Sequence, residues 1–87
     1  MAYHLEIVPR AERQIRKLPP PAQVRVIAAI ESLQHNPRPT GVKKLGGDHE
    51  TYRLRLGDFR IIYQIQDRKL IVLILAVGDR KDIYRKF

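Results

Sequence analysis

Three arginines between residues 51 and 66 have the spacing of a phosphate-binding site. Apolar residues alternate with other residues along this stretch, and only Gly57 and Asp58 break the alternation, which predicts two strands joined by a hairpin turn. With a two-residue turn, Arg55 faces Arg60, and Arg53 lies diagonally from Arg60 on the same face of the ribbon. Like charges directly opposite one another destabilise a sheet by up to about 1 kcal/mol. An anionic ligand such as a phosphate chain would remove this penalty.

A solvated cluster without a ligand is the alternative interpretation. The chain contains 17 Lys and Arg among 87 residues, so some like-charged neighbours arise by chance. An arginine can also extend into solvent while its aliphatic stem covers apolar surface. A longer hairpin loop would shift the cross-strand pairs, so the interpretation depends on the register of this hairpin.

The composition predicts one basic domain, residues 1–87, without a disulfide or a metal. The chain lacks cysteine, and its three histidines, His4, His35 and His49, are far apart in the sequence, so we expect neither a metal nor another cofactor. A net charge of +8 points to a polyanionic partner, either nucleic acid or an acidic protein. The apolar run over residues 70–77 is too short to span a bilayer and the N-terminus does not resemble a secretion signal, which predicts a cytoplasmic protein without a membrane partner.

A strand over residues 3–8 and two helices are predicted in the first half of the chain. Pro9 permits the first helix to begin, and the prolines at positions 19–21 end it and open the second helix. The apolar residues of each helix recur at helical spacing. These residues are Ala11, Ile15 and Leu18 in the first helix, and Val26, Ile27, Ile30 and Leu33 in the second. Each helix should bury this stripe against a sheet.

The last predicted strand, residues 69–77, is apolar on both faces. With Asp67 and Arg68 as the preceding turn, Val72 and Ile74 join the face of Ile61 and Tyr63. On the other face, three residues of this strand lie beside three of its neighbour: Ile71, Leu73 and Leu75 beside Gln64, Ile62 and Arg60. The helices cover only one face. The apolar strip next to the arginines therefore requires the C-terminal segment or a partner protein to cover it, unless it is simply the second face of a central strand.

The order of elements, βααβββ, predicts an α+β domain. The sheet should have four strands, mostly antiparallel, with the two-helix hairpin packed on one of its faces. Three basic residues of the first helix, Arg10, Arg13 and Arg16, then contact a polyanion or only keep the outer face of that helix solvated.

Two segments of the chain resemble the RelE branch of the RelE/ParE superfamily of bacterial and archaeal toxins. They are KKLGGDHETYRLRLGDFRIIYQI, which contains the arginine ribbon, and the ending VGDRKDIYRKF. The resemblance covers essentially the whole chain. It implies a translation-dependent endoribonuclease that enters the ribosomal A site and cuts mRNA there, and that a cognate acidic antitoxin holds inactive. The toxin–antitoxin complex of this family is further expected to bind operator DNA through the antitoxin.

The resemblance also assigns site residues. The basic ribbon positions of the family fall on Arg53, Arg55 and Arg60, its C-terminal arginine on Arg80, and its terminal tyrosine on Tyr84. Some well-known members carry lysine where this chain has Arg53 and Arg55. Because arginine stays charged, these two positions can bind and stabilise a phosphate but hardly act as bases.

RNA cleavage without a metal requires the ribose 2′-OH to attack its own phosphate, which leaves a 2′,3′-cyclic phosphate and a 5′-OH. Arg55 and Arg60, with Arg53 as a binding residue, can surround the crowded phosphorane. Tyr84 is the candidate base; its ordinary pKa is about 10, and neighbouring guanidinium charge would lower that pKa. Arg80 would stabilise or protonate the leaving oxygen.

Each of these assignments has a structural alternative. Tyr84 could anchor the C-terminal segment or stack on a base, and Arg80 could pair with Asp79 or Asp82. His49 lies in the loop before the ribbon, where a histidine is more often solvated than catalytic. Five other basic residues are predicted to contact the backbone of ribosomal RNA: Lys43, Lys44, Lys81, Arg85 and Lys86.

Two other functions compete with the nuclease. The ParE branch shares the fold and inhibits DNA gyrase by binding, without RNA chemistry. A basic RNA-binding module would bind message and cut nothing. The combination of ribbon arginines with Arg80 and Tyr84 favours the nuclease over the gyrase inhibitor, while the RNA-binding module predicts that affinity falls in Arg→Ala variants and no cut appears.

Overall fold

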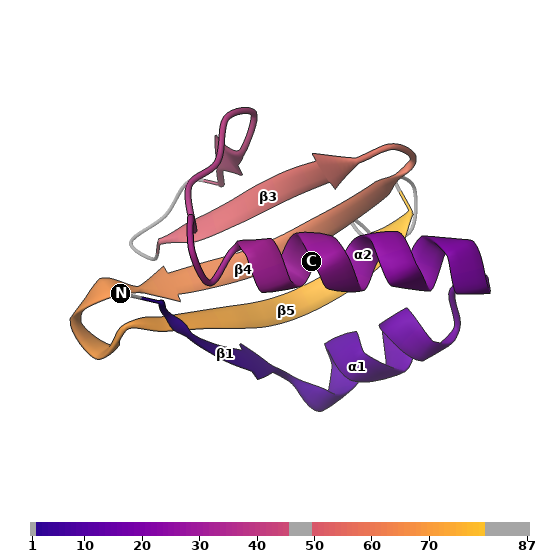
Figure 1. Ribbon diagram of the computed structural model, residues 1–87, viewed down its shortest axis with the longest axis horizontal. Helices are drawn as coiled ribbons and strands as arrows, with labels where there is room; N and C mark the ends of the chain where they lie inside the picture. Colours follow the sequence, from indigo (N-terminus) through magenta and orange to yellow (C-terminus); the bar gives the residue numbers. More distant parts are fainter. Residues whose placement is uncertain (1, 46–49, 80–87) are drawn as a thin grey trace.

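The structure, a computed structural model that describes residues 2–45 and 50–79, is a five-stranded mixed sheet with two helices on one face (Figure 1). The strands lie in the order β1-β5-β4-β3-β2; β1 is parallel to β5, and the other pairs are antiparallel. The elements are β1 (His4–Ile7), α1 (Pro9–Arg16), α2 (Pro20–Ser32), β2 (Lys43–Lys44), β3 (Thr51–Leu56), β4 (Phe59–Gln66) and β5 (Ile71–Asp79). The α+β class and the helix hairpin are confirmed, while the predicted count of four strands is wrong. The additional strand, β2, is only two residues long, too short for alternation to reveal it.

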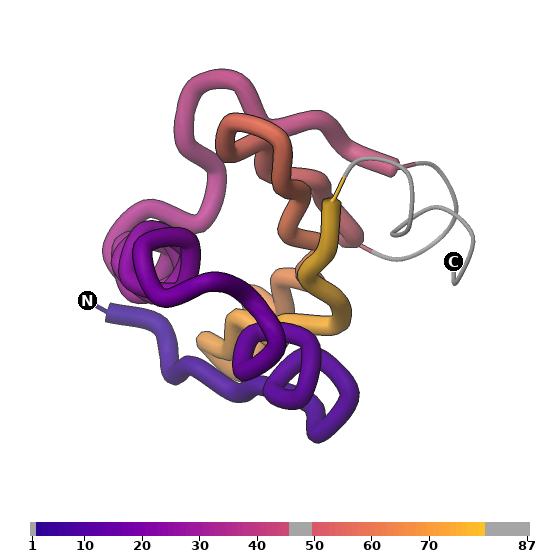
Figure 2. The backbone as a smooth tube through the Cα atoms, turned by 90° about the vertical axis from the view of Figure 1, so that its right-hand side faces the viewer, coloured from indigo at the N-terminus to yellow at the C-terminus, as the bar shows by residue number. Residues whose placement is uncertain are grey.

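The two helices form the predicted hairpin with a proline-rich corner. A proline occupies the first turn of each helix, where its missing N–H costs no hydrogen bond. Gln23 joins the helices across the corner, because its side-chain amide donates to the carbonyl oxygens of Arg16 (3.1 Å) and Leu18 (2.8 Å). Figure 2 shows the arrangement from the side, with α2 close to end-on. Neither described helix is long and apolar enough to cross a membrane.

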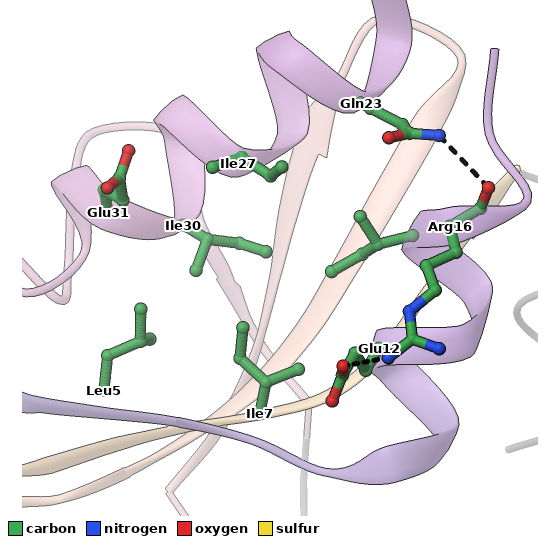
Figure 3. A pocket seen from close by; sticks show the side chains of 9 residues that line it. Leu5, Ile7, Glu12, Arg16, Gln23, Ile27, Ile30 and Glu31 are labelled. Atoms are coloured by element: carbon green, nitrogen blue, oxygen red, sulfur yellow. Dashed lines mark hydrogen bonds and ion pairs between the residues drawn. The ribbon is translucent and has the colours of Figure 1, made fainter. Parts of the chain in front are cut away.

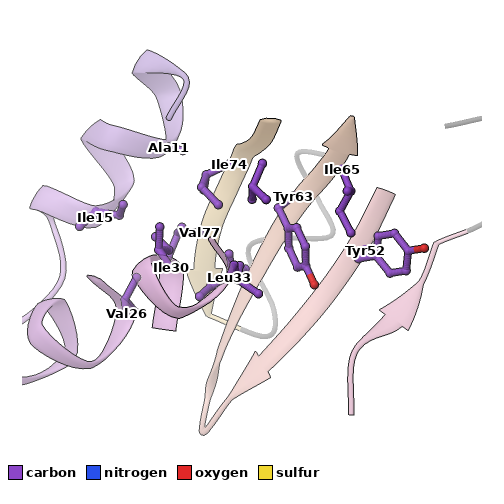
Figure 4. Close-up of a cluster of buried hydrophobic side chains, with 12 residues drawn as sticks. Ala11, Ile15, Val26, Ile30, Leu33, Tyr52, Tyr63, Ile65, Ile74 and Val77 are labelled. Atoms are coloured by element: carbon purple, nitrogen blue, oxygen red, sulfur yellow. The ribbon is translucent and has the colours of Figure 1, made fainter. Parts of the chain in front are cut away.

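The core lies between the helices and one face of the sheet (Figure 4). Buried residues of α1, α2 and the following turn pack against buried residues of the three central strands: Ala11, Ile15, Val26, Ile30 and Leu33 against Tyr52, Ile61, Tyr63, Ile65, Val72, Ile74 and Val77. The predicted stripe of the second helix is wrong at Ile27, which is 44% exposed. It lies at the edge of the helix, beside an open groove rather than in the core.

The predicted hairpin between β3 and β4 is confirmed. Leu56 pairs with Phe59 and Arg55 with Arg60, so Gly57 and Asp58 form a two-residue turn. Gly57 has a φ of +59°, a left-handed conformation that glycine adopts without steric penalty. This turn sets the register of all the other pairs between β3 and β4.

The turn between β4 and β5 differs from the prediction. Instead of two residues, a 3₁₀ turn over Asp67–Lys69 and a left-handed Leu70 (φ 55°) connect the strands. Val72 and Ile74 still face the core as predicted, but the partners of β5 shift along β4 by two positions. Leu73 therefore pairs with Gln64 rather than with Ile62.

A β-bulge in β5 changes the register a second time. Tyr63 pairs with Ile74, whereas the preceding Ile62 pairs with Ala76, so Leu75 is an extra residue without a partner on β4. Arg60 consequently pairs with Gly78 and not, as predicted, with Leu75. Alternation predicts one-to-one pairing between strands, and a bulge breaks this pairing.

The face of the sheet away from the helices carries an apolar strip that differs in part from the prediction, because the bulge pairs Ala76 with Ile62 on this face. Ile62 and Ala76 are each 1% exposed and form a second, smaller cluster. Leu45 and Leu75 are partly buried against them. The strip therefore lies next to the arginines, as the sequence indicates, and loop residue Leu45 contributes to covering it.

Candidate active site on the basic face of the sheet

Four basic side chains project from the face of the sheet opposite the helices. Arg55 lies directly opposite Arg60, and Arg53 is two positions along β3 on the same face, as predicted. The short strand β2 adds a fourth residue, because Lys43 pairs with Arg53 and so shares its face. We call Lys43, Arg53, Arg55 and Arg60 the basic face.

Arg60 is the buried member of the basic face. Only 5% of its surface is exposed, and it is the one buried charged residue in the described part of the chain. Its Nη1 donates to the carbonyl oxygens of Gly57 (3.2 Å) and Phe59 (3.1 Å), so the hairpin turn holds the guanidinium group. Its Nε is also buried and makes no hydrogen bond within the described residues. A buried donor without a hydrogen bond is costly, so the burial of Arg60 is not what folding alone would favour.

None of the ion pairs between described residues involves Arg55 or Arg60. The carboxylates of Glu12, Glu50 and Asp67 are engaged elsewhere, by Arg16, Lys44 and Arg38. Two guanidinium groups thus lie on adjacent strands without an ion-pair partner in residues 2–45 and 50–79. Oxygens of a phosphate group would satisfy both through charge-assisted hydrogen bonds.

Lys44 belongs to a different surface from Lys43. It pairs with Tyr52 and therefore faces the helix side of the sheet, where its Nζ lies 3.2 Å from Oε1 of Glu50. An ion pair at this position competes with the predicted contact to RNA.

Six further predicted residues lie outside the described residues: Arg80, Lys81, Tyr84, Arg85 and Lys86 of the C-terminal segment, and His49 of the loop before β3. Arg80 follows directly on Asp79, the last residue of β5, which pairs with Phe59.

Sequence reasoning missed a polar network around Arg38. The guanidinium Nη2 of Arg38 contacts Asp67 Oδ2 at 2.8 Å and Glu50 Oε2 at 3.1 Å, and its Nε donates to the Tyr52 hydroxyl at 3.1 Å. The Tyr52 hydroxyl in turn donates to Glu50 at 2.6 Å, and the Tyr3 hydroxyl donates to Asp67 at 2.7 Å. This network fastens the loop after α2 to β3 and to the β4–β5 turn.

The network has electrostatic consequences. Hydrogen bonds from Tyr52, Lys44 and Arg38 lower the pKa of Glu50 to about 2. The hydrogen bond from Arg38 likewise lowers the pKa of Asp67, while the hydrogen bond to Asp67 raises the pKa of Tyr3. Because Arg38 lies 29 positions from Asp67, and Tyr3 lies 64 positions from Asp67, no local pattern reveals the network.

An apolar groove lies on the other side of the molecule, between β1 and the two helices (Figure 3). It has a volume of about 440 Å³, and five of its nine lining residues are aliphatic: Leu5, Ile7, Ile15, Ile27 and Ile30. Ile7 and Ile27 are 36% and 44% exposed, so the groove presents apolar surface to solvent. The Arg16–Glu12 ion pair lies at its rim.

Comparison with known proteins places the chain in a family. Residues 5–84 match the family model of the ParE toxin of type II toxin–antitoxin systems. The chain belongs to this toxin family. The finding confirms the predicted membership of the RelE/ParE superfamily, and the toxin's relatives lie on the RelE side of it.

The toxin is similar in sequence to the putative toxin RelE1 of Methanocaldococcus jannaschii, with 32% identity over 98% of both chains. It is 30% identical to the mRNA interferase toxin RelE of Escherichia coli, over 97% of this chain and 92% of the relative. In structure it is similar to the toxin in the intact E. coli RelBE toxin–antitoxin complex, with a TM-score of 0.80, 28% identity and coverage of 92% of this chain and 99% of that one. The chain is therefore a toxin of a RelBE-type toxin–antitoxin system.

The basic face of the toxin can bind and stabilise negative charge. Arginine is always charged and presents donors in a planar fork that matches two phosphate oxygens. Arg60 is held by the hairpin turn, so it needs little reorganisation when charge develops on a bound phosphate. Because arginine stays charged, these side chains do not serve as proton acceptors.

Proposed function

We propose that this toxin is an endoribonuclease that cuts mRNA in the ribosomal A site without a metal. The observation that carries the proposal is the buried, turn-held Arg60 directly opposite Arg55, because folding gains nothing from this pair and a phosphodiester would satisfy it. The 30% identity to a relative named as an mRNA interferase supports the same conclusion.

In the proposed mechanism the ribose 2′-OH attacks the adjacent phosphorus, and the bond from phosphorus to the 5′ oxygen breaks. The products are a 2′,3′-cyclic phosphate and a 5′-OH. Arg55 and Arg60 stabilise the added negative charge of the phosphorane, and Arg53 binds the flanking backbone. Tyr84 takes the proton of the 2′-OH, and Arg80 stabilises or protonates the leaving oxygen.

The ribosome supplies the remaining requirements. Lys43, Lys81, Arg85 and Lys86 contact the ribosomal RNA backbone, which positions the toxin without reading sequence. Lys44 joins them only by giving up its ion pair with Glu50. Orientation of the message in the A site compensates for modest acid–base chemistry, since holding reactants in place contributes strongly to catalysis. The site of action is thus cytoplasmic.

A small acidic antitoxin is proposed to neutralise the toxin. The relatives of known structure include a toxin in complex with its antitoxin, and the groove lined by Ile7, Ile27 and Ile30 offers apolar surface for an amphipathic segment. An acidic chain that continues from the groove onto the basic face would cover Arg55 as well. Operator DNA is then bound through the antitoxin.

The nuclease is tested by primer extension on a message engaged by ribosomes. Wild-type toxin should produce cuts at A-site codons. Arg60→Lys keeps the charge but loses the guanidinium fork, and it should slow cutting by about 10²–10³-fold, the usual effect of removing one stabilising donor. Tyr84→Phe and Arg80→Ala should also abolish most cutting.

The matched control for these variants is Arg68→Gln. Arg68 is an exposed arginine of the 3₁₀ turn, at the end of β4 away from the basic face, so its loss should leave cutting unchanged. A message that stays uncut although wild-type toxin binds the ribosome would contradict the proposal.

Gyrase inhibition is the second candidate, because the matched family model describes the ParE toxin. It predicts inhibition of supercoiling by purified gyrase, and filamentation with a DNA-damage response in cells. Arrested growth with cut messages and intact DNA favours the nuclease. Binding to RNA that weakens in Arg→Ala variants without any cut would instead indicate a basic RNA-binding module.

A further inference from the structure

A side chain of α1 caps the backbone of β5 close to the basic face. The Oε1 of Gln14 accepts a hydrogen bond of 2.8 Å from the backbone N–H of Val77. The two residues are 63 positions apart, and Val77 is 1% exposed. Without Gln14 this N–H would be a buried donor in need of a partner.

The need for this cap follows from where β1 ends. β1 accompanies β5 only as far as the pair Ile7–Ile74, and Val8 adds a last hydrogen bond to the carbonyl oxygen of Ile74 at 3.1 Å. Pro9 then begins α1, which packs against β5. The later residues of β5 therefore pair with β4 on one side only, and Gln14 of α1 supplies a partner on the other.

The capped segment is the bulged part of β5. Because Leu75 is an extra residue, Ala76 pairs with Ile62, Val77 with Ile61 and Gly78 with Arg60. If β5 had no bulge, each of these residues of β5 would pair one position earlier along β4 in the chain. Val77 would then lie opposite Arg60 on the basic face. Side chains directly opposite each other approach within about 4.5–5.5 Å at Cβ.

The bulge thus keeps a glycine, rather than a valine, beside the buried arginine. Arg55, Arg60 and Gly78 form one row across three strands, and only the first two carry side chains. In the shifted register Ala76 would also replace Val77 in the core opposite Ile61, where the smaller side chain would leave a void. Both effects depend on the same backbone register.

We propose that Gln14 is a positioning residue for the RNA site: by capping Val77 it locks the bulged register of β5, which keeps Gly78 beside Arg60. The register also fixes the position of Asp79, the last residue of β5, which pairs with Phe59. The role in cleavage rests on the proposed nuclease function.

Three variants test this role. Gln14→Met keeps the length and helix propensity of the side chain but lacks a strong acceptor. Gln14→Glu restores an oxygen at the same distance. Gln34→Met is the matched control, because Gln34 also makes one partly buried hydrogen bond to a backbone group, the carbonyl oxygen of Tyr3 (3.1 Å), at the opposite end of the sheet.

The readouts are the cleavage rate at saturating toxin, the toxin concentration at half saturation, and amide exchange of Val77 by NMR. Gln14→Met should speed exchange at Val77 and lower the saturated rate by about 10–100-fold, the scale expected when reacting groups are displaced by about 1 Å. The half-saturating concentration should change less than the rate does. Gln14→Glu should recover most of the rate, and Gln34→Met should keep the wild-type rate even where it lowers stability.

Equal saturated rates for wild type and Gln14→Met would overturn the proposal. So would unchanged exchange at Val77, or equal rate losses in Gln14→Met and Gln34→Met, which would reveal a general loss of stability. If wild-type toxin cuts nothing, the nuclease function is contradicted. Cross-strand NOEs between β4 and β5 then test the register independently of cleavage. In Gln14→Met, contacts of Arg60 should then move from Gly78 toward Val77, and unmoved contacts would contradict the role of Gln14.

Discussion

Arg55 and Arg60 form a like-charged pair that does not stabilise the fold, although it suits the binding of an anion. Each charge destabilises the other across the hairpin, and Arg60 is nevertheless 5% exposed, with two carbonyl oxygens fixing its position. The spacing in the sequence predicted the register of this pair, because the turn residues Gly57 and Asp58 are recognisable locally. The burial of Arg60 could not be predicted from the sequence, since it depends on tertiary packing rather than on a local pattern.

We expect Arg55→Gln to weaken binding and leave the fold intact. Loss of one phosphate contact should reduce the slope of log affinity against log salt by about 1, and removal of the like-charge pair should change the free energy of unfolding by less than about 1 kcal/mol. Titrations of ribosomes at several salt concentrations, with urea unfolding of the free toxin, measure both quantities. Arg68→Gln removes the same charge away from the basic face, and an equal loss of slope in that variant would indicate non-specific attraction.

At the level of elements, the hairpin turn, the bulge and the 3₁₀ turn together decide which side chains share a face. Alternation and helix periodicity predicted both helices and the four longer strands. They did not predict the bulge at Leu75, because its extra residue is stabilised by a tertiary contact between Gln14 and Val77. They also missed β2, whose two residues pair with β3 only in the folded sheet.

Gly57 is the residue on which the hairpin depends most. Its φ of +59° is unfavourable for a β-branched residue, so Gly57→Val should lower the free energy of unfolding by about 1–2 kcal/mol. Gly57→Asn should cost less, because asparagine tolerates the left-handed region. A Cβ at this position would lie 3.5 Å from Nη2 of Arg25, an ordinary contact, so the difference reports backbone conformation. Equal losses in urea unfolding would contradict this account.

At the scale of the whole molecule, the toxin has two candidate functional surfaces separated by its core. The basic face lies on one side of the sheet, and the groove beside β1 and the helices lies on the other. The sequence indicated a polyanionic partner and an apolar strip, but the groove arises only when β1 and both helices come together. Similarly, the Arg38 network joins parts of the chain that no local pattern connects.

Stability should fall in acid through Glu50. Its pKa is lowered from 4.5 to about 2 by hydrogen bonds from Tyr52, Lys44 and Arg38, so the unfolded chain binds a proton first as the pH falls. The stabilisation is complete above pH 4.5 and is lost between about pH 4.5 and 2. Asp67, whose pKa is also lowered, adds to the same trend.

Urea unfolding at neutral pH and across this acid range measures the effect. Glu50→Gln should be less stable than wild type at neutral pH and should lose less stability in acid. Parallel curves for the two proteins would show that Glu50 does not carry the acid sensitivity.

We expect the basic face to promote attack by a ribose 2′-OH on the adjacent phosphate. The most direct measurement uses two messages on ribosomes with purified toxin, one all ribose and one with a single 2′-deoxynucleotide at the cut position in the A-site codon. The ribose message should be cut to a 2′,3′-cyclic phosphate, whereas the deoxy message should bind equally well but stay intact at that position. Equal cutting of both messages, or of neither, would contradict this expectation.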